Sequence, residues 1–179
     1  RIIIMTRSFD HVYGTQFFLM SLPEIIENEP DSRILLIGKG PLENQMKEMV
    51  HSLDLGKYVH FTGPVPNEDL SHYLNSSEIY VSTSKSDGTS LSLLEAMACG
   101  LPVVVSDVPA ICEWIEDGKN GYIVPRKKVA PISEKVLRLL ENPSQAERMG
   151  EINLAIARER ANWDKNFSTL EKIYRQMAE

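Results

Sequence analysis

Residues 79–105, IYVSTSKSDGTSLSLLEAMACGLPVVV, contain the pattern that decides the fold. Ile79–Val81 and Val103–Val105 are short runs of β-branched and aromatic residues, which are typical of buried strands. A polar turn and then an almost wholly apolar helical segment separate them. This order of strand, turn, helix and strand favours a parallel sheet covered by helices.

The same order repeats along the rest of the chain. Four further runs have strand character: 2–5, 33–37, 58–61 and 121–124. Helical patterns occupy 15–28, 42–53 and 67–74, with Asn67 as the expected N-cap of the third, and the chain is mostly helical over about 130–179. The sequence predicts an α/β fold, a doubly wound, parallel, six-stranded Rossmann-like sheet with helices on both faces, in a single domain over 1–179.

Composition narrows the class of protein. The 179 residues are 42% hydrophobic, enough for one compact domain, and the net charge of −6 argues against nucleic acid or an anionic membrane as a partner of the whole surface. Two cysteines and no Cys/His cluster argue against a disulfide scaffold or a zinc site. No apolar run approaches the roughly 20 residues of a membrane span, and no signal peptide opens the chain. We expect a cytoplasmic domain, and its start directly before a strand suggests a piece of a longer protein.

Ligands of doubly wound sheets bind beyond the carboxyl ends of the strands. The loops at those ends are 6–14, 38–41, 63–66, 84–90 and 106–109. We therefore expect these five loops to surround one crevice.

The segment 86–102 combines a phosphate-binding turn with an unusual carboxylate. A turn containing glycine and small hydroxyl residues bares backbone N–H groups, and the helix after it adds the positive end of its dipole. Glu95 lies on the apolar helix, where a ligand rich in hydroxyls, or a buried salt bridge, would offset the cost of burying it. Asp87 either caps this helix or lies beside a reacting centre.

Two further features flank the predicted crevice. Arg7 ends the first strand, where its guanidinium either binds a phosphate or forms a surface salt bridge. Gly38-Lys39-Gly40 is half of a dinucleotide fingerprint without its third glycine, and it is not a P-loop. A tight turn whose backbone approaches a flat ring is the better interpretation. The four histidines are scattered and no Asp-x-Asp pair occurs, so we expect neither a catalytic metal nor a cofactor.

The residues described above resemble those of a known family. Ser86–Asp107, SDGTSLSLLEAMACGLPVVVSD, resembles the donor-site segment of retaining glycosyltransferases of the GT-B fold, family four. That motif is an acid, seven residues and then a glutamate; Asp87 stands where glutamate is commoner, and Glu95 matches. Residues 113–121 and 61–65 resemble the family's downstream segment and its base-contacting loop. The resemblance covers essentially the whole chain and implies the C-terminal, donor-binding half of such an enzyme.

The resemblance also implies a role for each matching position. Glu95 would accept hydrogen bonds from the ribose hydroxyls of a nucleotide-diphosphate sugar, and Arg7 would stabilise the leaving diphosphate. Asp87 would hold the donor sugar and the diphosphate, so these three residues are the expected catalytic set. The expected donor-binding positions are the backbone amides of Gly88, Thr89, Ser90 and Leu91 and the base-framing loops that contain Gly38, Lys39, Gly40 and Val65.

One position departs from the family pattern. The family usually has a lysine just before the glycine of the first loop, but here Tyr13 precedes Gly14. A second phosphate cation is therefore missing unless Lys39 or Lys85 replaces it. We expect weaker phosphate binding, or a subgroup with different donor chemistry.

The resemblance implies that an N-terminal acceptor domain is absent from this chain. The isolated domain would bind the donor and transfer nothing, and the helix around 163–177 would pack on the missing domain. The acceptor, a saccharide or a lipid-linked molecule, and any contact with the inner face of the membrane would belong to that domain. Two alternatives stay open: a nucleotide-binding or regulatory module without catalysis, which Tyr13 and Asp87 favour, and a sugar-nucleotide epimerase.

Overall fold

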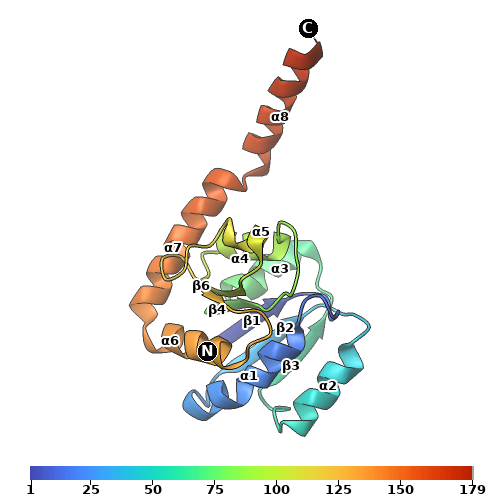
Figure 1. The fold of residues 1–179 in the computed structure, drawn as a ribbon, viewed down its shortest axis with the longest axis vertical. Coiled ribbons are helices and arrows are strands. Elements are labelled where there is room, and N and C mark those ends of the chain that lie inside the picture. Colours follow the sequence, from blue (N-terminus) through green and yellow to red (C-terminus); the bar gives the residue numbers. More distant parts are fainter. Residues whose placement is uncertain (179) are drawn as a thin grey trace.

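A parallel sheet of six strands forms the centre of the computed structural model, which describes residues 1–178 (Figure 1). Its strands are β1 (Ile2–Thr6), β2 (Arg33–Ile37), β3 (Val59–Gly63), β4 (Ile79–Ser82), β5 (Val103–Ser106) and β6 (Tyr122–Val124). Their order is β3-β2-β1-β4-β5-β6. The chain therefore adds β2 and β3 on one side of β1, and then β4, β5 and β6 on the other side. The predicted doubly wound α/β class is confirmed.

Eight helices pack around or extend from the sheet in the described residues. They are α1 (Thr15–Asn28), α2 (Glu43–Ser52), α3 (Asn67–Asn75), α4 (Leu91–Ala98), α5 (Pro109–Cys112), α6 (Ala130–Glu141), α7 (Pro143–Arg160) and α8 (Trp163–Ala178). Buried side chains of α1, α2 and α6 form one apolar cluster with the sheet, and those of α3, α4 and α5 form another. The two clusters are the two covered faces that the sequence predicts.

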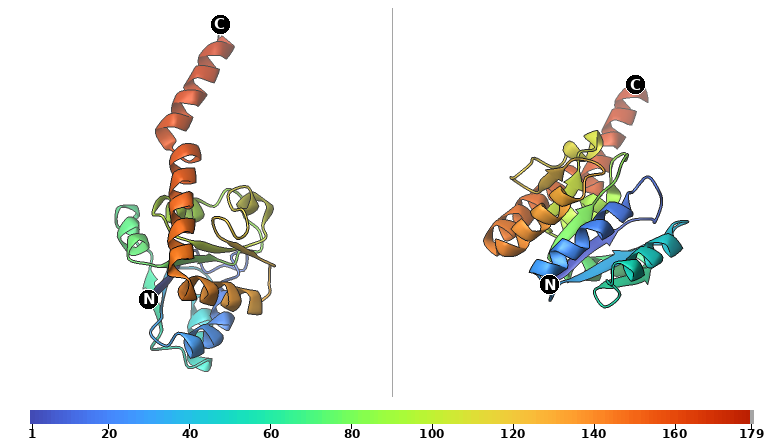
Figure 2. Two further views of the ribbon diagram at one scale, coloured as in Figure 1. Left: turned by 90° about the vertical axis from the view of Figure 1, so that its left-hand side faces the viewer. Right: turned by 60° about the horizontal axis from the view of Figure 1, so that its bottom comes forward.

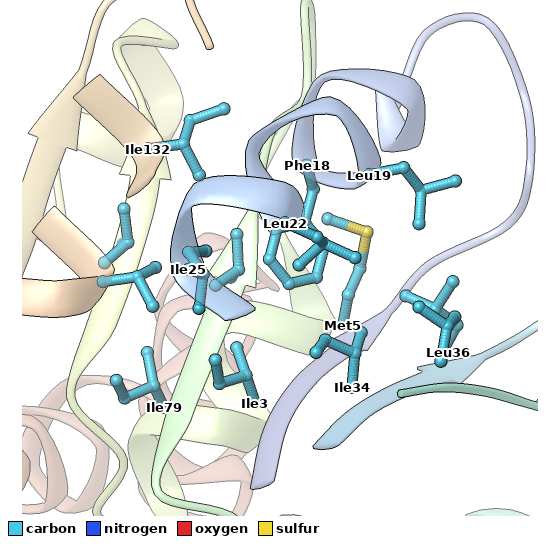
Figure 3. Close-up of a cluster of buried hydrophobic side chains, with 14 of the residues drawn as sticks. Ile3, Met5, Phe18, Leu19, Leu22, Ile25, Ile34, Leu36, Ile79 and Ile132 are labelled. Carbon is cyan, nitrogen blue, oxygen red and sulfur yellow. The ribbon is translucent and has the colours of Figure 1, made fainter. Parts of the chain in front are cut away.

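Alternation along the strands explains why the strands are apolar throughout. Ile3 and Met5 of β1 pack with Phe18 and Leu22 of α1 in the first cluster, as Figure 3 shows, whereas Ile4 belongs to the second. Successive side chains of a strand point to opposite faces, so a strand covered on both faces is apolar at every position.

The start of α3 corrects one prediction. Asn67 is the first helical residue, not the N-cap; Pro66 holds that position with φ −56° and ψ 144°, and no side chain caps the helix. The extended backbone of Pro66 leads directly into the helix, so the helix begins one residue too early for the Asn67 side chain to cap it.

The helix α8 projects away from the sheet (Figures 1 and 2). Its large apolar side chains are exposed: Trp163, Phe167, Leu170, Ile173, Tyr174 and Met177. No helix in the described part of the chain is both long and apolar enough to cross a membrane. The predicted packing of this helix on a second domain remains a prediction.

Candidate functional site

The loops at the carboxyl ends of the strands are joined by backbone hydrogen bonds. The N–H of Lys85 donates to the carbonyl of Val12 over 2.8 Å, which joins the loops after β4 and β1. The N–H of Phe9 donates to Lys39 over 3.1 Å, and that of Gly38 donates to Gly63 over 3.0 Å. Four of the five predicted loops therefore meet in a continuous series. The fifth joins them through the Arg126 side chain, which bonds both Asp107 and the Lys85 carbonyl.

Arg7, Asp87 and Ser90 form a polar cluster at this edge. The Nη2 of Arg7 donates to the Asp87 carboxylate and to the Ser90 hydroxyl. The side chains of the ion pair are only 10% and 12% exposed, and the Arg7 Nε is buried without a hydrogen-bond partner. Arg7 does pair with an acid, but inside the predicted crevice and not on the surface. An ion pair this shielded from water is screened less than an exposed one.

Ser90 caps α4, which removes the capping alternative for Asp87. The Ser90 Oγ accepts the N–H of Leu93 over 3.3 Å, and the helix begins at Leu91. An N-cap directly precedes the helix, whereas Asp87 lies three residues before Ser90. The sequence left two roles for Asp87; the structure excludes the cap and pairs its carboxylate with Arg7.

Glu95 lies half-buried on α4, beside a hollow of about 210 Å³ between α3 and α4. Within residues 1–178 its carboxylate forms no ion pair, which contradicts the buried salt bridge that the sequence left open. Burial raises the pKa of Glu95, and the positive charge of Arg7 partly opposes that rise. Hydrogen-bond donors from a ligand would offset this desolvation.

The start of α1 faces the same edge. Gly14 precedes the helix with φ 62°, no side chain caps the helix, and no acid lies in its first turn. A Cβ at Gly14 would overlap the carbonyl oxygen of Thr83, which explains the glycine. The positive end of α1 is thus available to an anion.

Three polar residues here were not found from the sequence. The side-chain oxygens of Thr6, Thr15 and Gln16 are buried without hydrogen-bond partners. Buried polar groups are normally satisfied, so these three atoms are exceptions that lie together at the carboxyl edge. Their positions, at the carboxyl end of β1 and in the two residues after Gly14, could have drawn attention to them.

The glycines of the loop after β2 let this loop pack closely against the end of β1 and the loop that follows it. A Cβ at Gly38, where φ is 137°, would overlap the carbonyl oxygen of Arg7, and a Cβ at Gly40 would lie 2.5 Å from that of Phe9. These glycines therefore permit a close approach to the protein's own backbone, and the approach of a flat ring to this loop remains a prediction. Val65, in the loop after β3, is half-buried against the second apolar cluster.

The structure places Tyr13 directly beside Arg7. The Arg7 Cζ lies 4.8 Å from the centroid of the Tyr13 ring, a cation–π geometry. Lys39 is exposed and Lys85 half-buried, and among the described residues neither forms an ion pair. Residues 88 and 89 are exposed in the turn before α4. Within residues 1–178, no group of three His, Cys, Asp or Glu side chains is arranged to hold a metal ion.

This chain spans less than half the length of the relatives whose sequences it matches. It is 30% identical over 144 residues to a GDP-mannose-dependent alpha-(1-6)-phosphatidylinositol monomannoside mannosyltransferase of Mycolicibacterium smegmatis, covering 76% of this chain and 38% of the relative. It is 29% identical over 174 residues to the N-acetyl-alpha-D-glucosaminyl L-malate synthase of Bacillus anthracis, covering 97% and 45%.

Solved structures share the fold. HepE of Anabaena, solved with UDP-glucose, superposes with a TM-score of 0.90 at 17% identity, over 98% of this chain and 48% of that one. The C-terminal domain of LpcC, a group 1 family glycosyl transferase of Francisella tularensis, superposes with a TM-score of 0.84 at 23% identity, over 90% and 86%. The sheet is thus that of GT-B glycosyltransferases.

The family model for glycosyl transferases group 1 matches residues 1–154, which include all six strands and the whole polar edge. This chain belongs to the group 1 glycosyl transferase family.

Proposed function

We propose that this chain is the donor-binding domain of a retaining, metal-independent glycosyltransferase and binds a nucleotide-diphosphate sugar at the carboxyl edge of its sheet. The observation that carries the proposal is the cluster of Arg7, Asp87 and Ser90 between the starts of α1 and α4. Glu95 follows on the same helix, with an unpaired, half-buried carboxylate. A retaining reaction is implied by the motif in residues 86–107.

In this proposal the diphosphate lies against the starts of α1 and α4. Both helix dipoles favour negative charge there, and Arg7 supplies a full positive charge. When the bond between the sugar carbon and the diphosphate oxygen breaks, its electron pair stays on that oxygen. Arg7 then stabilises the leaving group electrostatically, a contribution that preorganised charges make most effectively in a site shielded from water. Asp87 and the amides of residues 88–91 hold the donor sugar and the diphosphate.

Glu95 binds the ribose at the nucleoside end of the donor. An ionised carboxylate accepts hydrogen bonds from two neighbouring ribose hydroxyls, and these bonds replace the water that Glu95 loses by burial. The loops 38–41 and 63–66, including Val65, frame the base. Lys39 and Lys85 are the cations available to supplement Arg7.

The comparisons support a nucleotide-sugar donor but differ in the base. HepE was solved with UDP-glucose, and the mycobacterial relative uses GDP-mannose. We therefore propose a uracil or guanine nucleotide. Membership of the group 1 family favours sugar transfer over the epimerase alternative.

The proposal extends to a second domain that completes the enzyme. This chain would bind the donor and transfer no sugar alone, and the other domain would bind a saccharide or lipid-linked acceptor. A regulatory nucleotide-binding module is a second candidate, because Asp87 already neutralises Arg7 and Tyr13 stands in place of a cation. Sugar transfer by the longer protein, abolished by Glu95→Ala and Arg7→Ala, would decide for the enzyme.

A thermal-shift screen of this chain tests donor binding. UDP, GDP, ADP and their sugars are added separately, and the best binder raises Tm by mass action because it binds only the folded state. We expect a response to a uridine or guanosine diphosphate that Glu95→Ala and Arg7→Ala each reduce. A matched control, Glu147→Ala at the opposite edge of the sheet, should keep it. No response to any of these nucleotides contradicts the proposal.

A further inference from the structure

We propose that Tyr13 is a positioning residue for donor binding, whose ring holds the Arg7 guanidinium against Asp87 and Ser90. This inference rests on the proposed function, because it concerns how Arg7 meets a diphosphate. Tyr13 is then a residue that orients Arg7, and not only the absence of a second cation.

The bonds of Arg7 to Asp87 and Ser90 do not by themselves fix the orientation of the guanidinium group. Both groups bond the same nitrogen, Nη2, so they fix one corner of the guanidinium and leave it able to rotate about that corner. The Tyr13 ring covers a face of the group, with its centroid 4.8 Å from Cζ. Contacts from a corner and from a face together define one orientation.

That orientation leaves Nε of Arg7 without a partner. The side chain is nine-tenths buried, and Nε is a buried donor that no protein atom satisfies. Leaving such a donor unpaired is costly, so this arrangement of Arg7 must be stabilised by the other contacts of the guanidinium, of which the Tyr13 ring is one. A diphosphate oxygen, with its charge and acceptor capacity, would reach Arg7 through the tenth of the side chain that stays exposed.

The backbone that carries Tyr13 is held by hydrogen bonds within its loop and to the loop after β4. The N–H of Tyr13 donates to Asp10 over 3.1 Å, and the preceding Val12 accepts the N–H of Lys85 over 2.8 Å. Gly14 follows and is packed against Thr83. The backbone on both sides of the ring is therefore fixed to the start of α1 and to the loop after β4.

A ring and an ammonium group act on Arg7 in opposite ways. The face of an aromatic ring carries negative electrostatic potential and attracts a guanidinium, whereas a lysine at this distance would repel it. The chain thus uses one cation held in place by a ring, where the family pattern has two cations.

The binding test compares Tyr13→Phe, Tyr13→Leu and Tyr13→Met by calorimetry with UDP and with GDP. Phenylalanine keeps the ring, so binding should stay within about twofold of wild type. Leucine and methionine keep apolar volume without a ring, and we expect binding about 3- to 30-fold weaker. Two ringless variants protect the test against one that fails to fold.

A double-mutant cycle separates positioning from general packing. In an Arg7→Ala background, Tyr13→Leu should cause no further loss, because the group that it positions is gone. An equal loss in both backgrounds would overturn the inference.

A measurement without nucleotide checks the geometry independently. The side-chain protons of Arg7 lie over the ring, so their NMR signals should be shifted upfield in wild type and in Tyr13→Phe but not in Tyr13→Leu. Equal shifts in all three overturn the inference. If wild type binds nucleotide and loses binding with Glu95→Gln, but Tyr13→Leu binds normally, only the role of Tyr13 fails. If wild type binds neither UDP nor GDP, the proposed function fails and this inference with it.

Discussion

The amino and carboxyl edges of the sheet differ in the size of their cavities and in the charged and polar groups that they hold. At the amino edge, a cavity of about 420 Å³ lies among Arg1, Ile79, Leu101 and Leu140, twice the size of the hollow beside Glu95. Two of its charged groups have partners within the protein: Arg1 bonds Glu29, and Glu78 accepts the N–H of Ile2. The carboxyl edge has the smaller hollow but holds the buried ion pair of Arg7 and Asp87, several unpaired buried polar atoms and the uncapped start of α1.

The larger volume lies at the amino edge, whereas the buried ion pair and the uncapped helix start lie at the carboxyl edge. Buried polar atoms without a partner occur at both edges, because Ser32 directly precedes β2 and Tyr122 begins β6. The charged groups therefore distinguish the two edges better than the volumes or the unpaired atoms do. The comparison predicts that changes at the carboxyl edge act on ligand binding, and that changes at the amino edge act on stability.

The largest expected effect is that of Arg7→Ala on nucleotide binding. The change removes the charge proposed for the diphosphate and leaves Asp87 without its partner. A hydrogen bond to a charged group is worth about 1.5–3 kcal/mol, so binding of the best nucleotide should weaken about 10- to 100-fold. Calorimetry measures this, with Glu147→Ala at the amino edge as the control. Equal losses for both variants would contradict the assignment of nucleotide binding to the carboxyl edge.

Gly150→Ala, at the amino edge, should lower stability without changing nucleotide binding. A Cβ at Gly150 would overlap the carbonyl oxygen of Gly100, where α7 packs against the end of α4. Forcing an extra methyl group into such a contact costs about 1–3 kcal/mol. Urea denaturation should show this loss while nucleotide affinity of the folded protein stays unchanged. Gly56→Ala is the control, because nothing lies within 4 Å of its added Cβ.

Ser90→Ala should affect both properties modestly. Ser90 caps α4 and also bonds Arg7, so it belongs to the fold and to the site. Loss of a cap costs about 1 kcal/mol of stability. Denaturation and calorimetry on the same variant should both show a decrease. A loss of stability with unchanged affinity would show that the bond to Arg7 is dispensable.

The smallest expected effect is that of Glu95→Gln on stability without ligand. Burial raises the pKa of Glu95 in the folded protein, so ionisation opposes folding. The stability associated with the protonated form is complete below the pKa of the unfolded chain and is lost as the pH rises through the folded value. Glu95→Gln should therefore have a slightly higher Tm than wild type at pH 7, and the difference should disappear in acid. A difference independent of pH would contradict this assignment.

The strands were predictable because each is a short, β-branched run that is buried on both faces. The six predicted runs match the observed strands to within a few residues, and the polar loops follow from the rule for carboxyl edges. The short helix α5 and the break between α7 and α8 were not predicted. A helix of four residues has too few positions to show periodicity, and the break falls within a continuous helical pattern.

The candidate site was less predictable than the fold. Arg7, Asp87 and Glu95 could be named as site residues, but the partners of Arg7 could not. The ion pair joins residues 80 positions apart, and the stacking of Tyr13 depends on how one loop folds back over a strand end. Asp87 looked equally suitable as a cap because helix starts are uncertain by several residues in sequence, and that uncertainty covers both Asp87 and Ser90.

The ion pair between Arg7 and Asp87 also has a consequence for folding. Its partners follow β1 and β4, which are neighbours in the sheet although β2, β3 and three helices lie between them in the chain. Closing so long a loop costs entropy before any contact repays it, so the site forms late. Nucleotide binding would therefore report on assembly of the whole sheet, and a fragment that ends before β4 would fold, if at all, without a site.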